Sequence, residues 1–130
     1  MILVRVVAPV STGPRRGQSI TALARVVHDL NASFLRAHPD FPRIYASGVR
    51  YRAEPVDVRE QFCTAPATLA QGWGDCDDLA PWRSAELVVR DGVDAWPVVV
   101  RVGPSTWHVV VQTADGRTLD PSKKLGMRHP

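Results

Sequence analysis

Cysteine, charge runs and long apolar stretches are all scarce in this 130-residue sequence. Its two cysteines, Cys63 and Cys76, could form one disulfide, but nothing in their spacing requires one. No stretch approaches the roughly 20 apolar residues of a membrane-spanning helix, so we expect no membrane partner. The first ten residues are too short for the apolar part of a signal peptide and are interrupted by Arg5. A cytoplasmic, reducing location is therefore expected, since it would also keep Cys76 a thiol.

Dense runs of lysine and arginine are also missing. The formal charge of +3 and the pI near 9.3 lean basic without a concentrated patch, so nucleic acid is not an expected partner. The sequence contains no internal repeat and no low-complexity segment. With 45% hydrophobic and 22% charged residues, the composition is that of an ordinary globular protein. We therefore expect one domain spanning residues 1–130, large enough to bury a core.

Apolar periodicity predicts the first elements. Residues 2–7 are β-branched and aliphatic, which is typical of a strand. Helical spacing then runs from a cap at Ser19 or Thr21 to about Ala37. His28 lies beside the apolar stripe of this helix, and we expect it to be a partly exposed surface side chain.

Prolines and a glycine interrupt every period between residues 39 and 66. The sequence favours a short extended piece over Tyr45–Tyr51 and a helical turn or two over Val56–Phe62. Cys63 has no acidic, basic or glycine-rich neighbours, so we expect a small, buried, apolar side chain there.

The C-terminal half is clearer. A helix is predicted from Cys76 to about Arg90, closed by a glycine just past its end. Three strands should follow over residues 96–102, 106–113 and 117–120, with an irregular tail after them. Helices followed by an antiparallel meander make an α+β fold, with the N-terminal helices packed on an antiparallel sheet.

One segment, Gly72-Trp-Gly-Asp-Cys-Asp-Asp-Leu-Ala80, carries the strongest signal of chemistry. Its glycines allow a sharp turn and a close backbone approach. A helix that starts at Cys76 would direct its N–H groups and its positive dipole end at the sulfur. Downstream, His108 and Asp120 lie on the last two predicted strands. Together the three residues supply a nucleophile, its base and a group that orients the base.

The acidic neighbours of Cys76 work against its activation. Asp75, Asp77 and Asp78 disfavour a thiolate, although carboxylates in a first helical turn are natural caps. The helix dipole alone should therefore not activate the thiol, and His108 is needed. The same carboxylates with a histidine could bind Mg²⁺ or Ca²⁺, but capping explains them more simply. We expect no metal site and no cofactor.

Strand parity decides whether Asp120 can reach His108. A two-residue turn at Asp115-Gly116 would place the two side chains on opposite faces of the hairpin. A three-residue loop, Ala114-Asp-Gly116, would place position 120 opposite 110, diagonal to 108 on the same face. Such a loop needs Gly116 in the left-handed region. The triad therefore predicts the three-residue loop.

Further motifs occur in the order of a known family: Gly74-Asp-Cys76, Ala85-Glu86-Leu87, Gly92 with Ala95, Trp107-His108-Val109, and Gly116…Leu119-Asp120-Pro121. Over roughly residues 68–127 they resemble the transglutaminase-like core of the papain-like cysteine peptidase superfamily. The resemblance implies a papain-like fold with Cys76 as nucleophile, His108 as base and Asp120 as its orienter.

A longer set of segments is similar to small transglutaminase-like proteins encoded by bacteriophages: Ser47-Gly-Val-Arg-Tyr51, Gly74-Asp-Cys-Asp-Asp-Leu79 and Asp120-Pro-Ser…Leu125-Gly-Met127. This similarity implies the host cytoplasm or the virion as the location. A virion or assembly partner is then conceivable beside a substrate.

The resemblance implies a cysteine-dependent acyl-transfer enzyme that acts on amide or isopeptide bonds of a protein or peptide. The backbone N–H of Cys76 would form part of the oxyanion hole, with Gln71 or Trp73 as a second donor and Trp107 beside the substrate. Water as the acceptor would make a peptidase or amidase, and an amine would make a cross-linking transglutaminase. A non-catalytic structural or assembly module with the same fold is the alternative.

Pro81 departs from the helical pattern. It would remove one helical hydrogen bond and clash with the carbonyl of Asp77, at a cost of ~3 kcal/mol in a regular helix interior. Either the helix kinks there, or Pro81 opens the main helix after a separate first turn.

Overall fold

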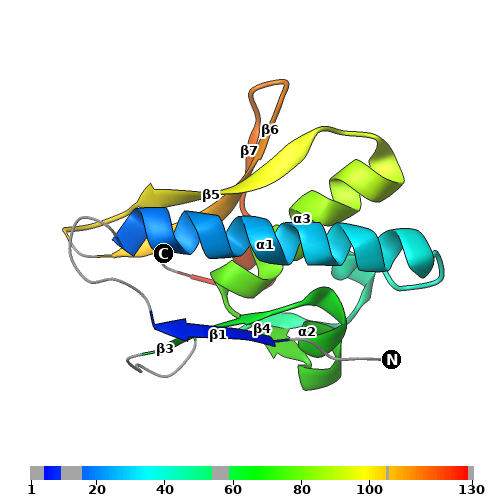
Figure 1. The fold of residues 1–130 in the computed structure, drawn as a ribbon, viewed down its shortest axis with the longest axis horizontal. Coiled ribbons are helices and arrows are strands. Elements are labelled where there is room, and N and C mark those ends of the chain that lie inside the picture. The colour runs from blue at the N-terminus through cyan, green and yellow to red at the C-terminus, as the bar shows by residue number, and fades with distance from the viewer. Residues whose placement is uncertain (1–4, 10–15, 54–58, 105, 129–130) are drawn as a thin grey trace.

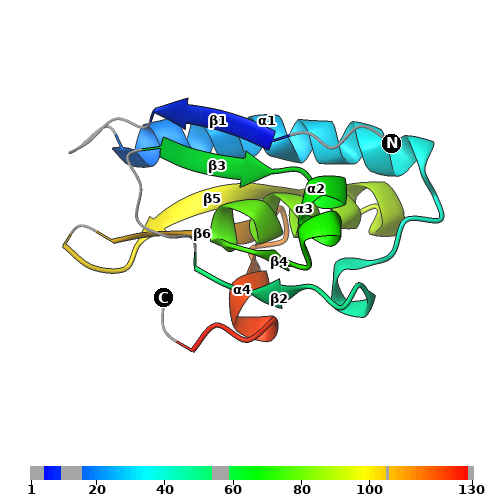
Figure 2. The ribbon, with the colours of Figure 1, turned by 90° about the horizontal axis from the view of Figure 1, so that it is seen from below.

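The computed structural model describes residues 5–9, 16–53, 59–104 and 106–128 (Figure 1). They form a mixed α+β fold, as expected. The elements run in the order β1 (Arg5–Pro9), α1 (Arg16–Ala37), the 3-10 turn η2 (Ile44–Ala46), β2 (Arg50–Tyr51), β3 (Arg59–Cys63), α2 (Ala65–Gln71), β4 (Trp73–Gly74), α3 (Cys76–Asp91), β5 (Ala95–Arg101), β6 (Trp107–Thr113), β7 (Thr118–Leu119) and α4 (Pro121–Lys124). Helices α1 and α3 lie between the β5–β6–β7 sheet and the β1–β3 pair (Figures 1 and 2).

Helix α1 begins earlier than the sequence indicates. It starts at Arg16, so Ser19 and Thr21 lie inside the helix and not at its cap. The hydroxyl of Thr21 donates to the Gly17 carbonyl, 2.8 Å away. This bond to the carbonyl four residues earlier is the one that a threonine inside a helix can make. Its end at Ala37 is confirmed. One stripe along it is buried, made of Ile20, Ala24, Val27, Asn31 and Leu35.

His28 is buried, with 9% of its surface exposed, so the expectation of a surface histidine is wrong. Its Nδ1 lies 2.6 Å from the hydroxyl of Ser84 on α3. Burial lowers the pKa of His28, partly offset by the charge of Asp29. A position beside the apolar stripe is covered when a second helix packs over it, and the periodicity of α1 alone cannot show that.

Two hydrophobic clusters flank α3. The first joins the C-terminal half of α1 to α2, α3 and Leu125, and its largest member is Trp82. The second joins the N-terminal half of α1 to β3, α3 and the β5–β6 pair, and its largest buried member is Phe62. Trp82 and Phe62 are both fully buried. Cys63 is also buried, with 2% of its surface exposed, as expected, and both cysteines are free thiols.

Helix α3 runs without a break from Cys76 to Asp91 and contains Pro81. The alternative in which Pro81 opens a separate helix is therefore wrong. Pro81 is buried, and its carbonyl accepts a hydrogen bond of 3.2 Å from the Ser84 hydroxyl. Gly92 caps the helix in the left-handed conformation, with φ of 65°, as predicted.

The meander is also confirmed. Strands β5, β6 and β7 form one antiparallel sheet in that order. The third strand is shorter than expected because the chain turns into α4 directly after Asp120. Pro121 stands in the first turn of α4, where its missing N–H costs nothing, and the Asp120 side chain accepts from the N–H of Lys123. Residues 121–124 of the expected irregular tail are therefore helical, whereas residues 125–128 belong to no helix or strand, and Leu125 and Met127 are buried.

The middle of the chain differs most from the prediction. Residues 59–63 form a strand paired antiparallel with β1, Arg5 opposite Cys63, so the expected helical turns are wrong there; residues 54–58 lie outside the described residues. Of the extended piece expected over Tyr45–Tyr51, only β2 is extended. Helix α2 was not predicted, because a proline usually indicates the end of a helix. Pro66 instead stands in the first turn of α2, where proline is tolerated.

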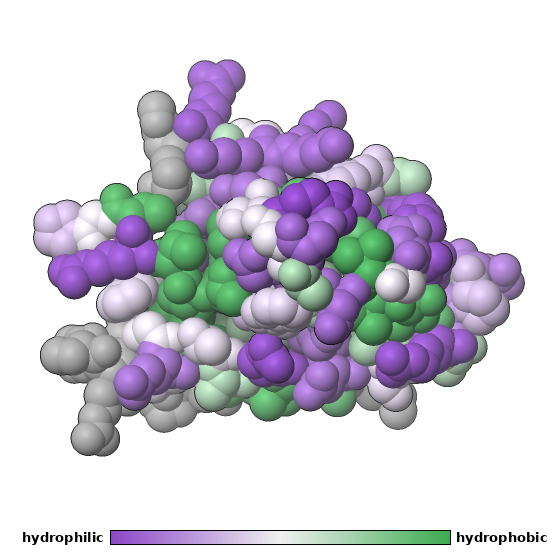
Figure 3. Space-filling view, turned by 90° about the horizontal axis from the view of Figure 1, so that it is seen from above, coloured by the Kyte–Doolittle hydropathy of each residue, from purple (hydrophilic) through white to green (hydrophobic). Residues whose placement is uncertain are grey.

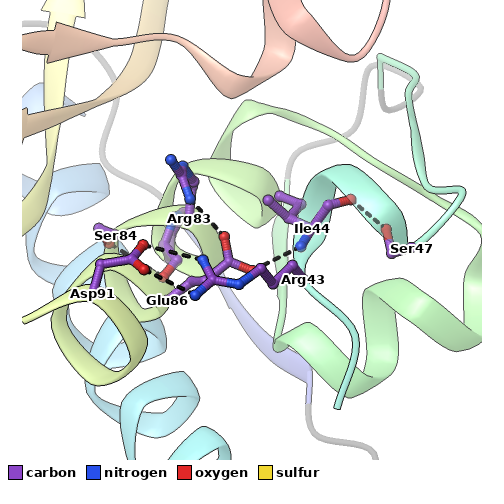
Figure 4. Close-up of polar contacts among 8 residues, drawn as sticks. Arg43, Ile44, Ser47, Arg83, Ser84, Glu86 and Asp91 are labelled. Atoms are coloured by element: carbon purple, nitrogen blue, oxygen red, sulfur yellow. Dashed lines mark hydrogen bonds and ion pairs between the residues drawn. The ribbon is translucent and has the colours of Figure 1, made fainter. Parts of the chain in front are cut away.

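A buried carboxylate anchors the segment before β2 (Figure 4). Glu86 of α3 is 1% exposed, and it accepts from the Ile44 N–H at 2.8 Å and from Arg83 at 2.7 Å. Arg43 and Asp91 form a two-bonded ion pair at 3.1 and 2.8 Å nearby. These bonds hold η2 against α3 and so position the chain that continues to Tyr51.

The face that carries the meander is mixed in character (Figure 3). Hydrophilic residues occupy its centre, and apolar residues reach the surface in separate patches on either side. Among the described helices, none combines the length and the apolar character that a membrane crossing needs.

Candidate active site

The turn before α3 is held by a reciprocal capping box. The Asp75 carboxylate accepts from the Cys76 N–H at 2.6 Å, and the Asp78 carboxylate accepts from the Asp75 N–H at 3.0 Å. Asp78 also accepts from the Cys63 N–H of β3 at 2.7 Å. The capping role expected for these acids is therefore confirmed for Asp75 and Asp78, and it fixes Cys76 as the first residue of α3.

Gly74 is required by packing. A Cβ at this position would lie 2.9 Å from Thr68, 3.0 Å from Leu79 and 3.2 Å from the Cβ of Asp78. Gly72, two residues earlier, ends α2 in the left-handed conformation with φ of 87°. The two glycines thus let the chain leave α2 and enter α3 within a few residues, as the sequence suggested.

The Cys76 sulfur lies at the edge of β6. Strand β7 pairs with β6 only at Val111 and Gln112, so this edge is open towards the start of β6. There the backbone N–H of Val109 acts on the Cys76 sulfur and favours its thiolate. Cys76 is half-buried and packs against the second hydrophobic cluster. The cysteine at the start of α3 is therefore close to the residue next to His108.

His108 and Asp120 are hydrogen-bonded across the hairpin. The His108 Nε2 lies 2.8 Å from Asp120 Oδ2, and the histidine is 3% exposed. The register pairs Val111 with Leu119, and Gly116 has φ of 91°, which confirms the three-residue loop. Since Nε2 faces the carboxylate, Nδ1 is the ring nitrogen left to exchange a proton with a substrate or a thiol.

Burial and negative charge both keep Cys76 protonated. Burial is the main cause that raises the pKa of the Cys76 thiol well above its usual value, and the charges of Asp75 and Asp77 add to it. The N–H of Val109 acts in the opposite direction. The sequence predicted the effect of the acids but not that of burial. Attack by this sulfur therefore requires removal of its proton by a base.

Asp78 is the other perturbed group of the site. It is fully buried, and burial raises its pKa to about 7, against the lowering effect of the N–H groups of Cys63 and Asp75. Two of the three carboxylates around Cys76, those of Asp75 and Asp78, thus accept hydrogen bonds from backbone N–H groups. The described part of the chain holds no cluster of three or more His, Cys, Asp or Glu side chains fit to bind a metal ion.

The other residues named from the sequence have local partners. Gln71 donates to the Trp73 carbonyl at 2.8 Å and accepts from Arg5 at 3.3 Å. The guanidinium carbon of Arg52 lies over the ring of Trp73, 5.1 Å from the ring centre. Trp107 lines a surface pocket of about 450 Å³ with Gly17, Gln18, Thr21, Ala22 and Val99. By strand alternation this pocket and His108 lie on opposite faces of β6, and roles for these three residues in substrate binding remain predictions.

Sequence reasoning missed Tyr51 as a member of the site. Tyr51 pairs with Gly74, two residues before Cys76, and the charges of Cys76 and Asp120 both act on its phenol. The sequence analysis placed Tyr51 in a motif but not beside Cys76, because this proximity arises from the parallel pairing of β2 with β4.

Comparisons of the chain with family models, with curated proteins and with solved structures return no match.

Proposed function

We propose that this protein is a cysteine-dependent acyl-transfer enzyme with a transglutaminase-like core of the papain-like cysteine peptidase superfamily. The observation that carries the proposal is the hydrogen bond between His108 Nε2 and Asp120 Oδ2, 2.8 Å long. Cys76 lies close to the same strand, because the N–H of Val109, which adjoins His108, acts on its sulfur. A thiol, an imidazole and a carboxylate in this order make up the machinery of thiol-based acyl transfer.

The chemistry starts from a neutral thiol. His108 takes the proton as the Cys76 sulfur attacks a carbonyl carbon, and Asp120 orients the ring and stabilises its charged form. When the intermediate collapses, His108 returns the proton to the leaving amine and a thioester remains on Cys76. Water then completes a peptidase or amidase reaction on an amide or isopeptide bond, whereas an amine would complete a cross-link.

A non-catalytic structural or assembly module is the second candidate. Two observations favour it: burial and acidic neighbours raise the pKa of the Cys76 thiol, and the Cys76 N–H is bonded to Asp75. A module of this kind would keep the fold and show no acylation of Cys76.

The test is acylation by p-nitrophenyl acetate at pH 7.5. We expect one acetyl group per chain, found by mass spectrometry on the peptide that contains Cys76, because Cys63 is 2% exposed. The Cys63→Ala variant should react like the wild type, and Cys76→Ala should not be acetylated. Acetylation at Cys63 alone, or none at either thiol, would support the non-catalytic module.

A further inference from the structure

Acyl transfer places negative charge on the former carbonyl oxygen, and a hydrogen-bond donor must meet that charge. Two of the donors expected from the sequence have other partners. The Cys76 N–H donates to its own capping residue Asp75 at 2.6 Å, and the side-chain amide of Gln71 donates to the Trp73 carbonyl at 2.8 Å. A further donor near the thiol would therefore help to stabilise the oxyanion.

The backbone of Tyr51 is fixed from both sides of the site. Tyr51 stands in register with Gly74 of β4, and the N–H of the following Arg52 donates to the Gly74 carbonyl at 2.9 Å. On the other side, the Tyr51 N–H donates to the carbonyl of Leu125 at 3.0 Å. Tyr51 is thus tied to the strand that leads into Cys76 and to the segment that follows Asp120.

The phenol of Tyr51 lies among the charged groups of the site. Its ring is half-buried and packs against the first hydrophobic cluster. Burial, followed by the charges of Asp75, Cys76, Asp77 and Asp120, raises the pKa of Tyr51 to about 12. The phenol therefore keeps its proton at neutral pH. A neutral hydroxyl within the field of the thiol is a donor that can meet a developing oxyanion.

We propose that Tyr51 donates a hydrogen bond from its phenolic hydroxyl to the oxyanion of the tetrahedral intermediate formed on Cys76. The inference rests on the function proposed above. In the step concerned, the sulfur–carbon bond forms, the carbonyl π electrons move to oxygen, and the thiol proton passes to His108. Tyr51 stabilises the charged oxygen without giving up its proton. Collapse restores the carbonyl, breaks the bond to the leaving group and gives that group the proton held by His108.

Tyr45 provides a matched control, because it is the only other tyrosine in the sequence. Its ring lies between two cations, 5.0 Å from Arg83 and 4.7 Å from Lys124, and 37% of its surface is exposed. Replacing either tyrosine by phenylalanine removes one hydroxyl and keeps the ring. The two variants therefore lose the same group in different surroundings: Arg83 acts on the Tyr45 phenol, whereas the charge of Cys76 acts on the Tyr51 phenol.

The experiment compares two reactions of the same thiol. Acylation by p-nitrophenyl acetate passes through an oxyanion, whereas alkylation by iodoacetamide displaces iodide at a saturated carbon and forms none. We expect Tyr51→Phe to slow acylation on the order of 10²-fold, the loss that accompanies removal of one oxyanion donor. Its rate of alkylation should stay at the wild-type value. Tyr45→Phe should leave both rates unchanged.

Two results would overturn this assignment alone. One is acylation of Tyr51→Phe at the wild-type rate. The other is a parallel fall of acylation and alkylation, which would place Tyr51 in the support of the thiol or of the fold. A wild-type protein without acylation at Cys76 would instead overturn the proposed function, and this inference with it.

Discussion

Single residues define how the thiol is presented, and Asp78 does most of this positioning. Its two oxygens accept from Cys63 on β3 and from Asp75 at the cap of α3. The sequence shows Asp78 only as one of three acids beside a cysteine. Its function as a bridge between two elements depends on Cys63, 15 residues away, and no local pattern reveals that partner.

Replacing Asp78 by alanine should destabilise the fold. The change leaves the N–H groups of Cys63 and Asp75 without their acceptors, and we expect the free energy of unfolding at pH 6 to fall by about 2–4 kcal/mol. Urea denaturation measures it. The matched control is Asp40→Ala in an exposed turn, which should change the free energy by less than about 0.5 kcal/mol. Equal effects of the two substitutions would contradict the bridge.

The pH dependence of that effect has a definite sign. The folded pKa of Asp78, about 7, lies above the ordinary value of 3.8, so the folded chain binds more protons than the unfolded chain between these values. The stability contributed by this titration is present below pH 3.8 and is lost as the pH rises through 7. The difference in unfolding free energy between wild type and Asp78→Ala should therefore be larger at pH 5 than at pH 8.

Among the elements, the β6–β7 hairpin was predicted down to its loop. Face parity is a local property of two adjoining strands, so the requirement that Asp120 meet His108 selected the three-residue loop. Strand β3 and helix α4 were not predicted, because they do not follow from a local property of this kind. β3 is a strand because it pairs with β1, fifty or more positions earlier, and α4 forms where Asp120 caps a turn that starts with proline. Helix α2 is hidden by the same property of proline in a first turn.

Replacing a glycine should have different effects in the two hairpin loops of the β5–β6–β7 sheet. Gly116 has φ of 91°, where an L side chain costs roughly 1–2 kcal/mol, so Gly116→Ala should lower the free energy of unfolding by about that amount. Gly103, in the turn between β5 and β6, has room for a Cβ, whose nearest neighbour would be Thr106 at 3.5 Å. Gly103→Ala should therefore be close to neutral in the same denaturation experiment. A neutral Gly116→Ala would contradict the left-handed loop and the register that depends on it.

At the scale of the whole molecule, the sequence predicted the α+β class of fold and the contact between His108 and Asp120. It could not predict how the N-terminal half surrounds them. The burial of His28 against α3 and the pairing of β2 with β4 both join segments more than twenty positions apart. The thiol packs against the second hydrophobic cluster, which also joins distant segments, and burial is the largest cause of its raised pKa. The need for a base thus follows more strongly from the fold than from the acidic neighbours alone.

The most direct test of that need is the rate at which p-nitrophenyl acetate acylates Cys76 at pH 7.5 in wild type and in His108→Ala. If His108 removes the thiol proton, its loss should slow acylation by about 10²–10⁴-fold. Asp120→Asn keeps the imidazole but changes the group that orients it. Its acylation rate should lie between those of the wild type and His108→Ala. Acylation of His108→Ala at the wild-type rate would show that Cys76 reacts without this histidine, and it would contradict the proposed catalytic centre.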